Sequence, residues 1–359
     1  MAEVKQISPA QRAQNFAAAT RQNFHMLPAQ TANQLGASMQ FTFPKSRLLS
    51  KTFVKVEASI KGSPELMKNN YNTNKRYDVF NIIRRISLSL NNGFDPFVVS
   101  GRDLAIMNTV RMNPAVLYNV CDTSIEDDMI YNNCGLVAYK QDEDDLIITF
   151  LLELENTLNQ RDTAGLILLQ NESTQVTLSL DLETSIAKVN ADATSLNYVK
   201  VTPMLQTFTI PNYAEAFPDL SILKLVKSRT ESFQNGGEHI LKLDVGTIYR
   251  KLVLYITDEN GQPLTADEIT SNIELIYNTA DTPVSIDASM LRLKNATDFG
   301  TLLPEGMFVF DFSGYQGMSG LSGSRDFVDT ERLSEFWIRF STNAKCSVTV
   351  VQENISRLR

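Results

Sequence analysis

The alternation of apolar and polar residues predicts a β-rich chain, and it is clearest between residues 77 and 108. Residues 86–90 alternate apolar with polar, which is the period of a strand with one buried face. Asn92-Gly93 then predicts a hairpin turn with positive φ, and a second strand follows over residues 97–99. Ser100 is placed to cap a short helix after this hairpin.

The same order of parts returns near the end of the chain, without a gap, at an offset of 187 residues. The helix cap recurs as well, because Ser100 falls on Asp287 and both side chains can accept from first-turn amides. We therefore interpret the chain as two copies of one β-rich unit. The matched pairs include Ile86 with Ile273, Leu88 with Leu275, Leu90 with Tyr277, Asn91 with Asn278, Pro96 with Pro283, Val99 with Ile286 and Asn108 with Asn295.

A second match lies upstream, where the segment from Lys51 resembles the segment from Lys251 in residue type. In this alignment Phe53 falls on Leu252 and Val54 on Val253. The offset is about twelve residues longer here, which the polar insert after Lys61 can absorb as a loop.

Further strands are expected over residues 146–155, 175–182, 198–210, 336–342 and 346–353. Each unit then offers around eight strands, interrupted by a helix and long loops, which is typical of a jelly roll. We predict a mainly β fold of two tandem eight-stranded jelly rolls, with short helices in long loops and an N-terminal helix. The expected division is an N-terminal arm over residues 1–38, a first jelly roll over 39–212, a linker region over 213–237 and a second jelly roll over 238–359.

The N-terminal arm is unusually basic for this chain, whose net charge is −8, since no acidic residue occurs from Val4 to Val56. Ser8 and Pro9 mark a helix start, and an apolar stripe then runs at helical spacing as far as Phe24, before Pro28. Such a helix either docks on the chain's own body or a neighbouring subunit, or touches an anionic lipid surface without inserting. The candidate membrane or neighbour contacts are Lys5, Arg12, Phe16, Arg21 and Phe24.

Composition limits the class of protein and the compartment in which it is made. The acidic balance argues against a dedicated, sequence-specific nucleic-acid binder, which needs a basic face. The three cysteines have no framework spacing and are typical of buried thiols in a protein made in a reducing compartment. The first residues lack the apolar core of a secretory signal, and the run from Leu146 is too short to cross a bilayer.

The sequence offers little catalytic or metal-binding chemistry. Its two histidines, His25 and His239, lie far apart, and the acidic clusters 126–128 and 142–145 lack the spacing of a calcium loop. Glu153 and Glu155 on one strand are a poor indication of glycosidase activity, and GMSGLSG lacks the order of a nucleophile elbow. We therefore expect no enzyme activity, catalytic residue, cofactor or metal.

The opening MAEVKQISPAQRAQNFAAATRQN resembles the N-terminus of tectivirus major capsid proteins, from tailless bacteriophages with a membrane inside an icosahedral shell. The resemblance implies a homotrimer that forms a pseudo-hexagonal capsomer and tiles the virion around that membrane, after synthesis in the host cytoplasm. The implied partners are neighbouring capsomers, minor capsid and vertex proteins, and the internal membrane through the N-terminal helix. The excursions 107–145 and 295–332 would form outer tops or intersubunit walls.

One alternative is a glycan-binding or receptor-binding jelly roll, such as an adhesin or a phage attachment protein. Such a site wants exposed aromatic side chains beside acidic groups, and the single tryptophan, Trp337, lies inside a predicted strand. A soluble lectin also has little use for the acid-free basic arm.

Overall fold

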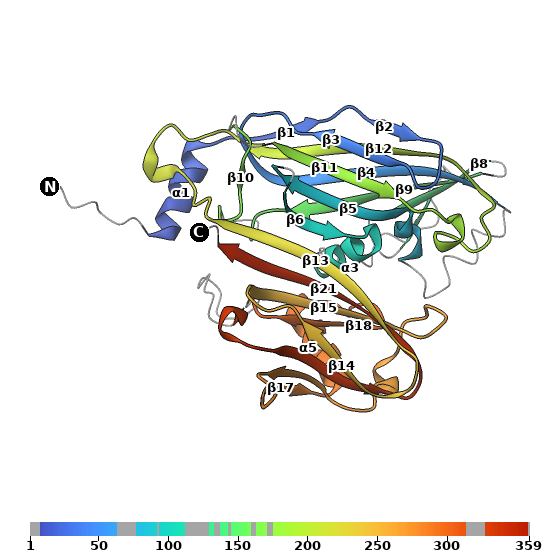
Figure 1. Ribbon diagram of the computed structural model, residues 1–359. Helices are drawn as coiled ribbons and strands as arrows, with labels where there is room; N and C mark the ends of the chain where they lie inside the picture. Colours follow the sequence, from blue (N-terminus) through green and yellow to red (C-terminus); the bar gives the residue numbers. More distant parts are fainter. Residues whose placement is uncertain are drawn as a thin grey trace.

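The computed structural model describes residues 8–62, 77–91, 93–111, 129–132, 137–142, 145–158, 163–170, 175–313 and 327–357. Within these residues the chain forms two units of strands, drawn one above the other in Figure 1, with the first unit in blue to green and the second in yellow to red.

The first unit has two facing sheets. One contains strands in the order β1-β12-β4-β9, and the other contains β3-β11-β5-β6. Short strands β2, β7, β8 and β10 extend the first of these sheets. The bounds are β1 (Gln22–Met26), β2 (Gln30–Ala32), β3 (Ser38–Thr42), β4 (Leu48–Lys61), β5 (Ile83–Leu90), β6 (Phe94–Val99), β7 (Met129–Asn132), β8 (Val137–Asp142), β9 (Asp145–Glu155), β10 (Ile167–Leu168), β11 (Val176–Leu182) and β12 (Ser195–Phe208).

The second unit repeats this strand order, with sheets β13-β21-β15-β18 and β14-β20-β16-β17. In both units the first, eighth, third and sixth strands form one sheet, while the second, seventh, fourth and fifth form the other. This is the jelly-roll connectivity, and it confirms the predicted fold class. The bounds are β13 (Ile222–Phe233), β14 (Gly237–Leu243), β15 (Ile248–Thr257), β16 (Ile273–Tyr277), β17 (Asp281–Ile286), β18 (Met307–Asp311), β19 (Val328–Asp329), β20 (Phe336–Thr342) and β21 (Cys346–Arg357).

Three of the strands that build the two jelly rolls lie where the sequence was interpreted as something else. The first strand of each unit falls in a stretch expected to be arm or linker, since β1 lies within 1–38 and β13 within 213–237. Strand β18 lies in the excursion 295–332, which was expected to be loop. Its residues are nearly all buried, so it shows no alternation of apolar and polar residues.

The hairpin repeat is confirmed by strand register. Ile86 faces Val99 across β5 and β6, and Ile273 faces Ile286 across β16 and β17, at the predicted offset of 187. Of the expected Asn92-Gly93 turn, Asn92 lies outside the described residues and Gly93 does not have positive φ, whereas Asn91, one residue earlier, has φ 56°. Its counterpart Asn278 has φ 49°, so the two turns use equivalent asparagines.

The upstream alignment was wrong by one residue. Lys51 faces Glu155 across β4 and β9, and Lys251 faces Asp311 across β15 and β18, so the two lysines are equivalent. Phe53 then corresponds to Val253 and not to Leu252, which lies in the core of the second unit. Because side chains alternate between the two faces of a strand, the slip of one residue had aligned the outward-facing Phe53 with the inward-facing Leu252.

One sheet joins the two units. Strand β13 of the second unit pairs in parallel with β6 of the first, with Val226 beside Phe97 and Lys227 beside Val98. The result is a nine-stranded sheet in the order β18-β15-β21-β13-β6-β5-β11-β3, with β19 pairing β15. Helix α3 (Gly101–Arg111) lies against β13 and β21 at this junction, and almost all of its residues are buried (Figure 1).

Helix α1 (Pro9–Ala19) begins where predicted, since the Ser8 hydroxyl accepts a hydrogen bond from the amide of Gln11 at 3.2 Å. It ends earlier than predicted, and Phe24 lies on β1 instead of on the helical stripe. Pairing with β12 satisfies the backbone of residues 22–26, which overrides a weak helical pattern. The remaining helices are α5 (Ala288–Phe299) and the 3₁₀ turns η1 (Asp78–Ile82), η2 (Ile186–Lys188), η3 (Ala214–Ala216), η4 (Ala266–Glu268) and η5 (Thr330–Arg332).

Candidate functional site

Helix α1 is docked on the first unit of its own chain. Phe16 is only 5% exposed and packs edge-on against Phe208, with ring centroids 5.4 Å apart. Leu48 and Leu166 complete this small apolar cluster. The hydroxyl of Tyr213 donates to the carbonyl of Asn15 at 3.3 Å. The apolar side of the helix therefore faces protein.

The expected contact residues divide into two groups. Arg12 and Phe16 lie on α1. Arg21 lies just before β1 and Phe24 lies on it, whereas Lys5 is outside the described residues. Arg12 is half-buried, whereas Arg21 is exposed and its amide donates to the Thr209 hydroxyl at 2.9 Å. Phe24 is 60% exposed at the edge of the sheet.

The charge of Arg12 lies near Asp219. Hydrogen bonds from Ser221, together with the charges of Arg12 and Arg357, lower the pKa of the Asp219 carboxyl. Part of the basic character of the N-terminal arm is thus balanced within the chain.

A cleft of about 580 Å³ separates α1 from the outer face of the sheet. Its lining is mixed, with Lys51 and Gln206 beside small and aromatic residues. The full lining is Ala13, Phe16, Ala17, Thr20, Gln22, Ser50, Lys51, Thr163, Leu166, Gln206 and Phe208.

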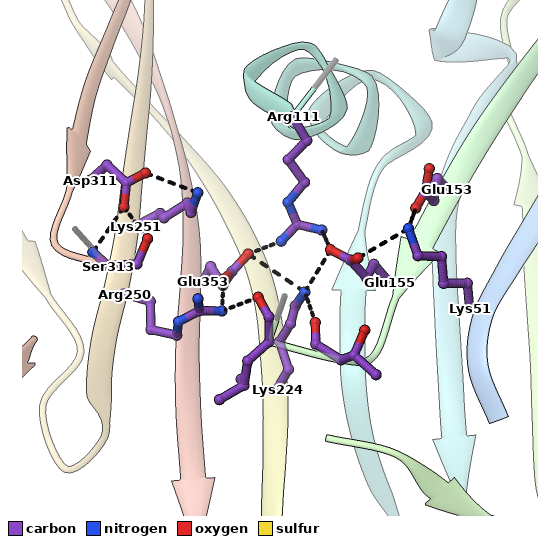
Figure 2. A network of polar contacts seen from close by, with 12 residues as sticks. Lys51, Arg111, Glu153, Glu155, Lys224, Arg250, Lys251, Asp311, Ser313 and Glu353 are labelled. Carbon is purple, nitrogen blue, oxygen red and sulfur yellow. Dashed lines mark hydrogen bonds and ion pairs between the residues drawn. The ribbon is translucent and has the colours of Figure 1, made fainter. Parts of the chain in front are cut away.

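A buried ionic network lies where the two units meet (Figure 2). Glu155 of β9 accepts from Arg111 at 3.2 Å and lies 3.4 Å from the ammonium of Lys224 in β13. Glu353 of β21 pairs with Arg111 and, at 2.6 Å, with Arg250 of β15. Arg111, at the end of α3, therefore bridges carboxylates from both units.

Each unit also carries its own lysine-to-acid pair beside this network. Lys51 lies 2.6 Å from Glu153 and 3.0 Å from Glu155, and Lys251 lies 2.9 Å from Asp311. The two glutamates that gave a poor indication of glycosidase activity thus hold a structural lysine.

Burial and charge oppose each other in this network. Burial alone would raise the pKa of Glu155, but the charges of Lys224, Arg111 and Lys51 outweigh it and lower that pKa to about 2. Burial and the repulsion of Arg111 lower the pKa of Lys224, against the attraction of Glu155. Burial lowers the pKa of Lys251 despite Asp311. The network holds buried charges that depend on one another.

Sequence reasoning did not find this network. Its members come from β4, α3, β9, β13, β15, β18 and β21, so only the fold brings them together. One signal was available in the repeat, because Lys51 and Lys251 are equivalent and both face an acidic residue on the sixth strand.

The described residues contain no group of three or more histidine, cysteine or acidic side chains able to hold a metal. His239 is buried, lies 2.7 Å from the Thr342 hydroxyl and stacks on Phe233, and burial lowers its pKa. Cys346 is a buried free thiol. Among the described helices, none is long and apolar enough to cross a membrane. The acidic cluster 126–128, the GMSGLSG loop, Cys121 and Cys134 lie outside the described residues.

No protein-family model matches the chain, and no curated protein matches it. Solved structures do. The major capsid protein of Sulfolobus Turreted Icosahedral Virus is 13% identical with a TM-score of 0.64, and the match covers 93% of this chain and 96% of that one. The PBCV-1 virus capsid matches at 11% identity and a TM-score of 0.65, covering 94% and 95%.

A third match is the Faustovirus major capsid protein, at 10% identity and a TM-score of 0.62, covering 95% of this chain and 90% of that chain. At these identities the likeness concerns the fold. The agreement extends over both units and nearly the whole of each chain compared. The chain therefore has the double jelly-roll fold found in viral major capsid proteins.

Proposed function

We propose that this chain is the major capsid protein of an icosahedral virion, of the tectivirus type, and that it acts by assembly. Three copies form a pseudo-hexagonal capsomer, and capsomers tile a shell around an internal membrane together with minor capsid and vertex proteins. Two similar jelly rolls per chain let a three-fold oligomer present six similar edges to a lattice.

The observation that carries this proposal is the duplicated jelly roll, which spans the chain and matches capsid proteins over at least 90% of their own lengths in the three structures described above. The glycan-binding alternative is less favoured. Trp337, its one expected anchor, lies within β20 with the Lys242 ammonium 5.3 Å from its ring.

The native mass tests the proposal. Light scattering of the purified protein at several concentrations is expected to give three times the chain mass of 40.2 kDa, independent of concentration. A monomer at every concentration would count against the capsomer.

We propose that the N-terminal arm contacts the membrane through its basic side chains, by electrostatic attraction to anionic headgroups. Phe16 points into the protein, and the exposed residues on α1 are Gln11, Gln14, Ala17 and Ala18, so the described side chains of this helix include no large apolar group that is free to insert. Basic side chains near anionic headgroups contribute about 1 kcal/mol each.

Vesicle flotation tests this contact. Charge reversal at Arg12 and Arg21 is expected to weaken binding to phosphatidylserine vesicles at low salt, while reversal at exposed Lys242 of β14 leaves it unchanged. Equal binding by all three proteins would assign the helix to protein docking alone.

A further inference from the structure

The two surfaces that pack together between the units each have an equivalent elsewhere in the chain, because the two units are built alike. Within the chain, the edge strand β6 and helix α3 of the first unit lie against β13 and the outer face of the second. By the repeat, β6 corresponds to β17, α3 to α5, and β13 to β1. Both β1 and β17 are edge strands in the described sheets.

Strand register gives the correspondence residue by residue. Phe53, Met204 and Met26 form one row across β4, β12 and β1. The equivalent row across β15, β21 and β13 is Val253, Val351 and Ser228.

The second unit's row is covered, whereas the first unit's row is open. Val253 and Val351 are fully buried, and the Ser228 hydroxyl donates to Asp103 of α3 at 2.6 Å. In the first unit Met26 is 64% exposed, and Met204 and Phe53 are only partly buried. Among the described residues, this row is therefore covered in the second unit and exposed at Met26 in the first.

The equivalent helices α3 and α5 also differ in exposure, but here the first unit's helix is the buried one. Asp103 and Ile106 of α3 are buried, with Ile106 at 0% exposure, and Asp103 contacts the second unit through Ser228. Their counterparts on α5, at the offset of 187, are Met290 and Leu293, which are 57% and 60% exposed. Inside the chain, Ser228 contacts Asp103, and both side chains are polar. Their equivalents, Met26 for Ser228 and Met290 for Asp103, are both exposed and apolar. Met26 and Met290 would therefore suit each other in a contact between two copies.

The cleft beside α1 fits the same arrangement. Arg111, at the end of α3, ion-pairs with Glu353. Glu353 faces Lys251 as Gln206 faces Lys51, so its counterpart is Gln206, which lines the cleft with Lys51. The counterpart of Arg111 is Asp298 on α5, which pairs with Lys294 of its own helix, so the neighbouring chain would bring this ion pair toward the cleft.

We propose that the β1 face of one copy of this chain, with Phe24 and Met26, docks on the β17 edge and α5 of a second copy, with Met290 and Leu293. The contact repeats the packing between the two units and places Phe24 beside Val284 and His25 beside Ser285, as Val226 and Lys227 lie beside Phe97 and Val98. Figure 1 shows β1 and β17 at opposite ends of the molecule, so the contact is head to tail and can close a ring. This inference rests on the proposed capsomer and names its subunit interface.

Substitutions at the two methionines test the interface. Met26→Lys and Met290→Glu, each alone, are expected to raise the concentration at which trimers dissociate at least tenfold. The double variant places opposite charges in every interface and is expected to bind more tightly than either single variant. Ile240→Lys, at a 40% exposed position on β14, is the matched control and is expected to leave dissociation unchanged.

Oxidative cross-linking gives an independent measurement. A chain carrying both Met26→Cys and Met290→Cys is expected to form covalent dimers and trimers on oxidation, whereas each single cysteine variant does not. The inference is overturned if the wild type is a trimer but the single variants dissociate like Ile240→Lys and the cysteine pair does not cross-link. A wild type that is monomeric throughout would instead overturn the proposed function.

Discussion

Asn108 and Asn295 hold the same position in the two units, and each ties its helix to the sixth strand of its jelly roll. The Asn295 amide donates to the carbonyl of Val309 at 2.8 Å and accepts from the Val309 amide at 2.9 Å. Asn108, with its amide oriented to satisfy both groups, makes the same two bonds to Glu153, at 3.0 and 2.8 Å. Both asparagines are buried, so each satisfies backbone groups that water does not reach.

Replacing either asparagine with alanine should therefore be costly. Asn108→Ala or Asn295→Ala removes two buried hydrogen bonds and leaves a strand N–H and C=O without partners. We expect a loss of about 2 to 4 kcal/mol in the free energy of unfolding, measured by urea denaturation. Thr297→Ala, on an exposed part of α5, is the control and should change it by less than about 0.5 kcal/mol. Equal effects of the three substitutions would contradict the role of the asparagines.

The turn asparagines allow backbone conformation and hydrogen bonding to be separated. Asn278 has positive φ, and its side chain accepts from the amide of Ser334 at 2.9 Å. Asn278→Gly keeps the conformation accessible and loses only the side-chain acceptor, whereas Asn278→Ala loses both. We expect the alanine variant to be less stable than the glycine variant by about 1 kcal/mol, measured as a difference in urea midpoint.

Equal stability of the two variants would show that the left-handed conformation carries no cost at this position. The same pair of substitutions at Asn91 is a second test, because its side chain accepts from the Gln175 amide at 2.8 Å.

These recurring asparagines show what the sequence could predict. A repeat at a fixed offset is visible wherever the chain alternates apolar and polar residues, so the hairpin, the cap and Asn108 with Asn295 were found directly. Strand β18 was missed because both of its faces are covered, one by the core and the other by the first unit, which removes the alternation.

The first strands and the ionic network needed information that the sequence carries only weakly. The five residues of β1 are mostly exposed, and Phe24 and Met26 are their only apolar side chains, so a helical stripe ending at Phe24 was the simpler interpretation. The network depends on charges from seven elements that meet only after folding. Lys51 lies in the acid-free stretch of the sequence, yet its partners lie about a hundred residues away.

The lowered pKa of Glu155 predicts acid sensitivity. Its pKa is about 2 in the folded chain, against 4.5 for an unperturbed glutamate. The unfolded state therefore takes up the proton first, and the stabilisation, about 3 kcal/mol, is complete above pH 4.5 and is lost as the pH falls toward 2. Urea midpoints between pH 7 and pH 3 should fall more steeply for the wild type than for Glu155→Gln. Parallel pH profiles would show that this carboxylate does not contribute.

The balance of charge in the network predicts an asymmetry between its cations and its anions. Among the described residues, five cations, Lys51, Arg111, Lys224, Arg250 and Lys251, meet four anions, Glu153, Glu155, Asp311 and Glu353.

Glu353→Gln leaves Arg111 and Arg250 without the carboxylate that they share, which should cost about 3 to 5 kcal/mol of unfolding free energy. Lys224→Met instead removes a cation from a site where the described cations outnumber the described anions by one, and burial already lowers the pKa of that lysine. The variant loses the 2.6 Å hydrogen bond to the carbonyl of Thr157 and the attraction to Glu155, but it also relieves the buried charge of the lysine, so we expect a net cost below about 2 kcal/mol.

Urea denaturation of the two single variants and of the double variant measures both costs and their coupling. The double variant should be more stable than Glu353→Gln alone, because removing Lys224 takes away one of the positive charges that Glu353 had neutralised. If Lys224→Met proved as damaging as Glu353→Gln, the excess of positive charge would not govern this junction, and the packing of the lysine stem between β13 and β9 would.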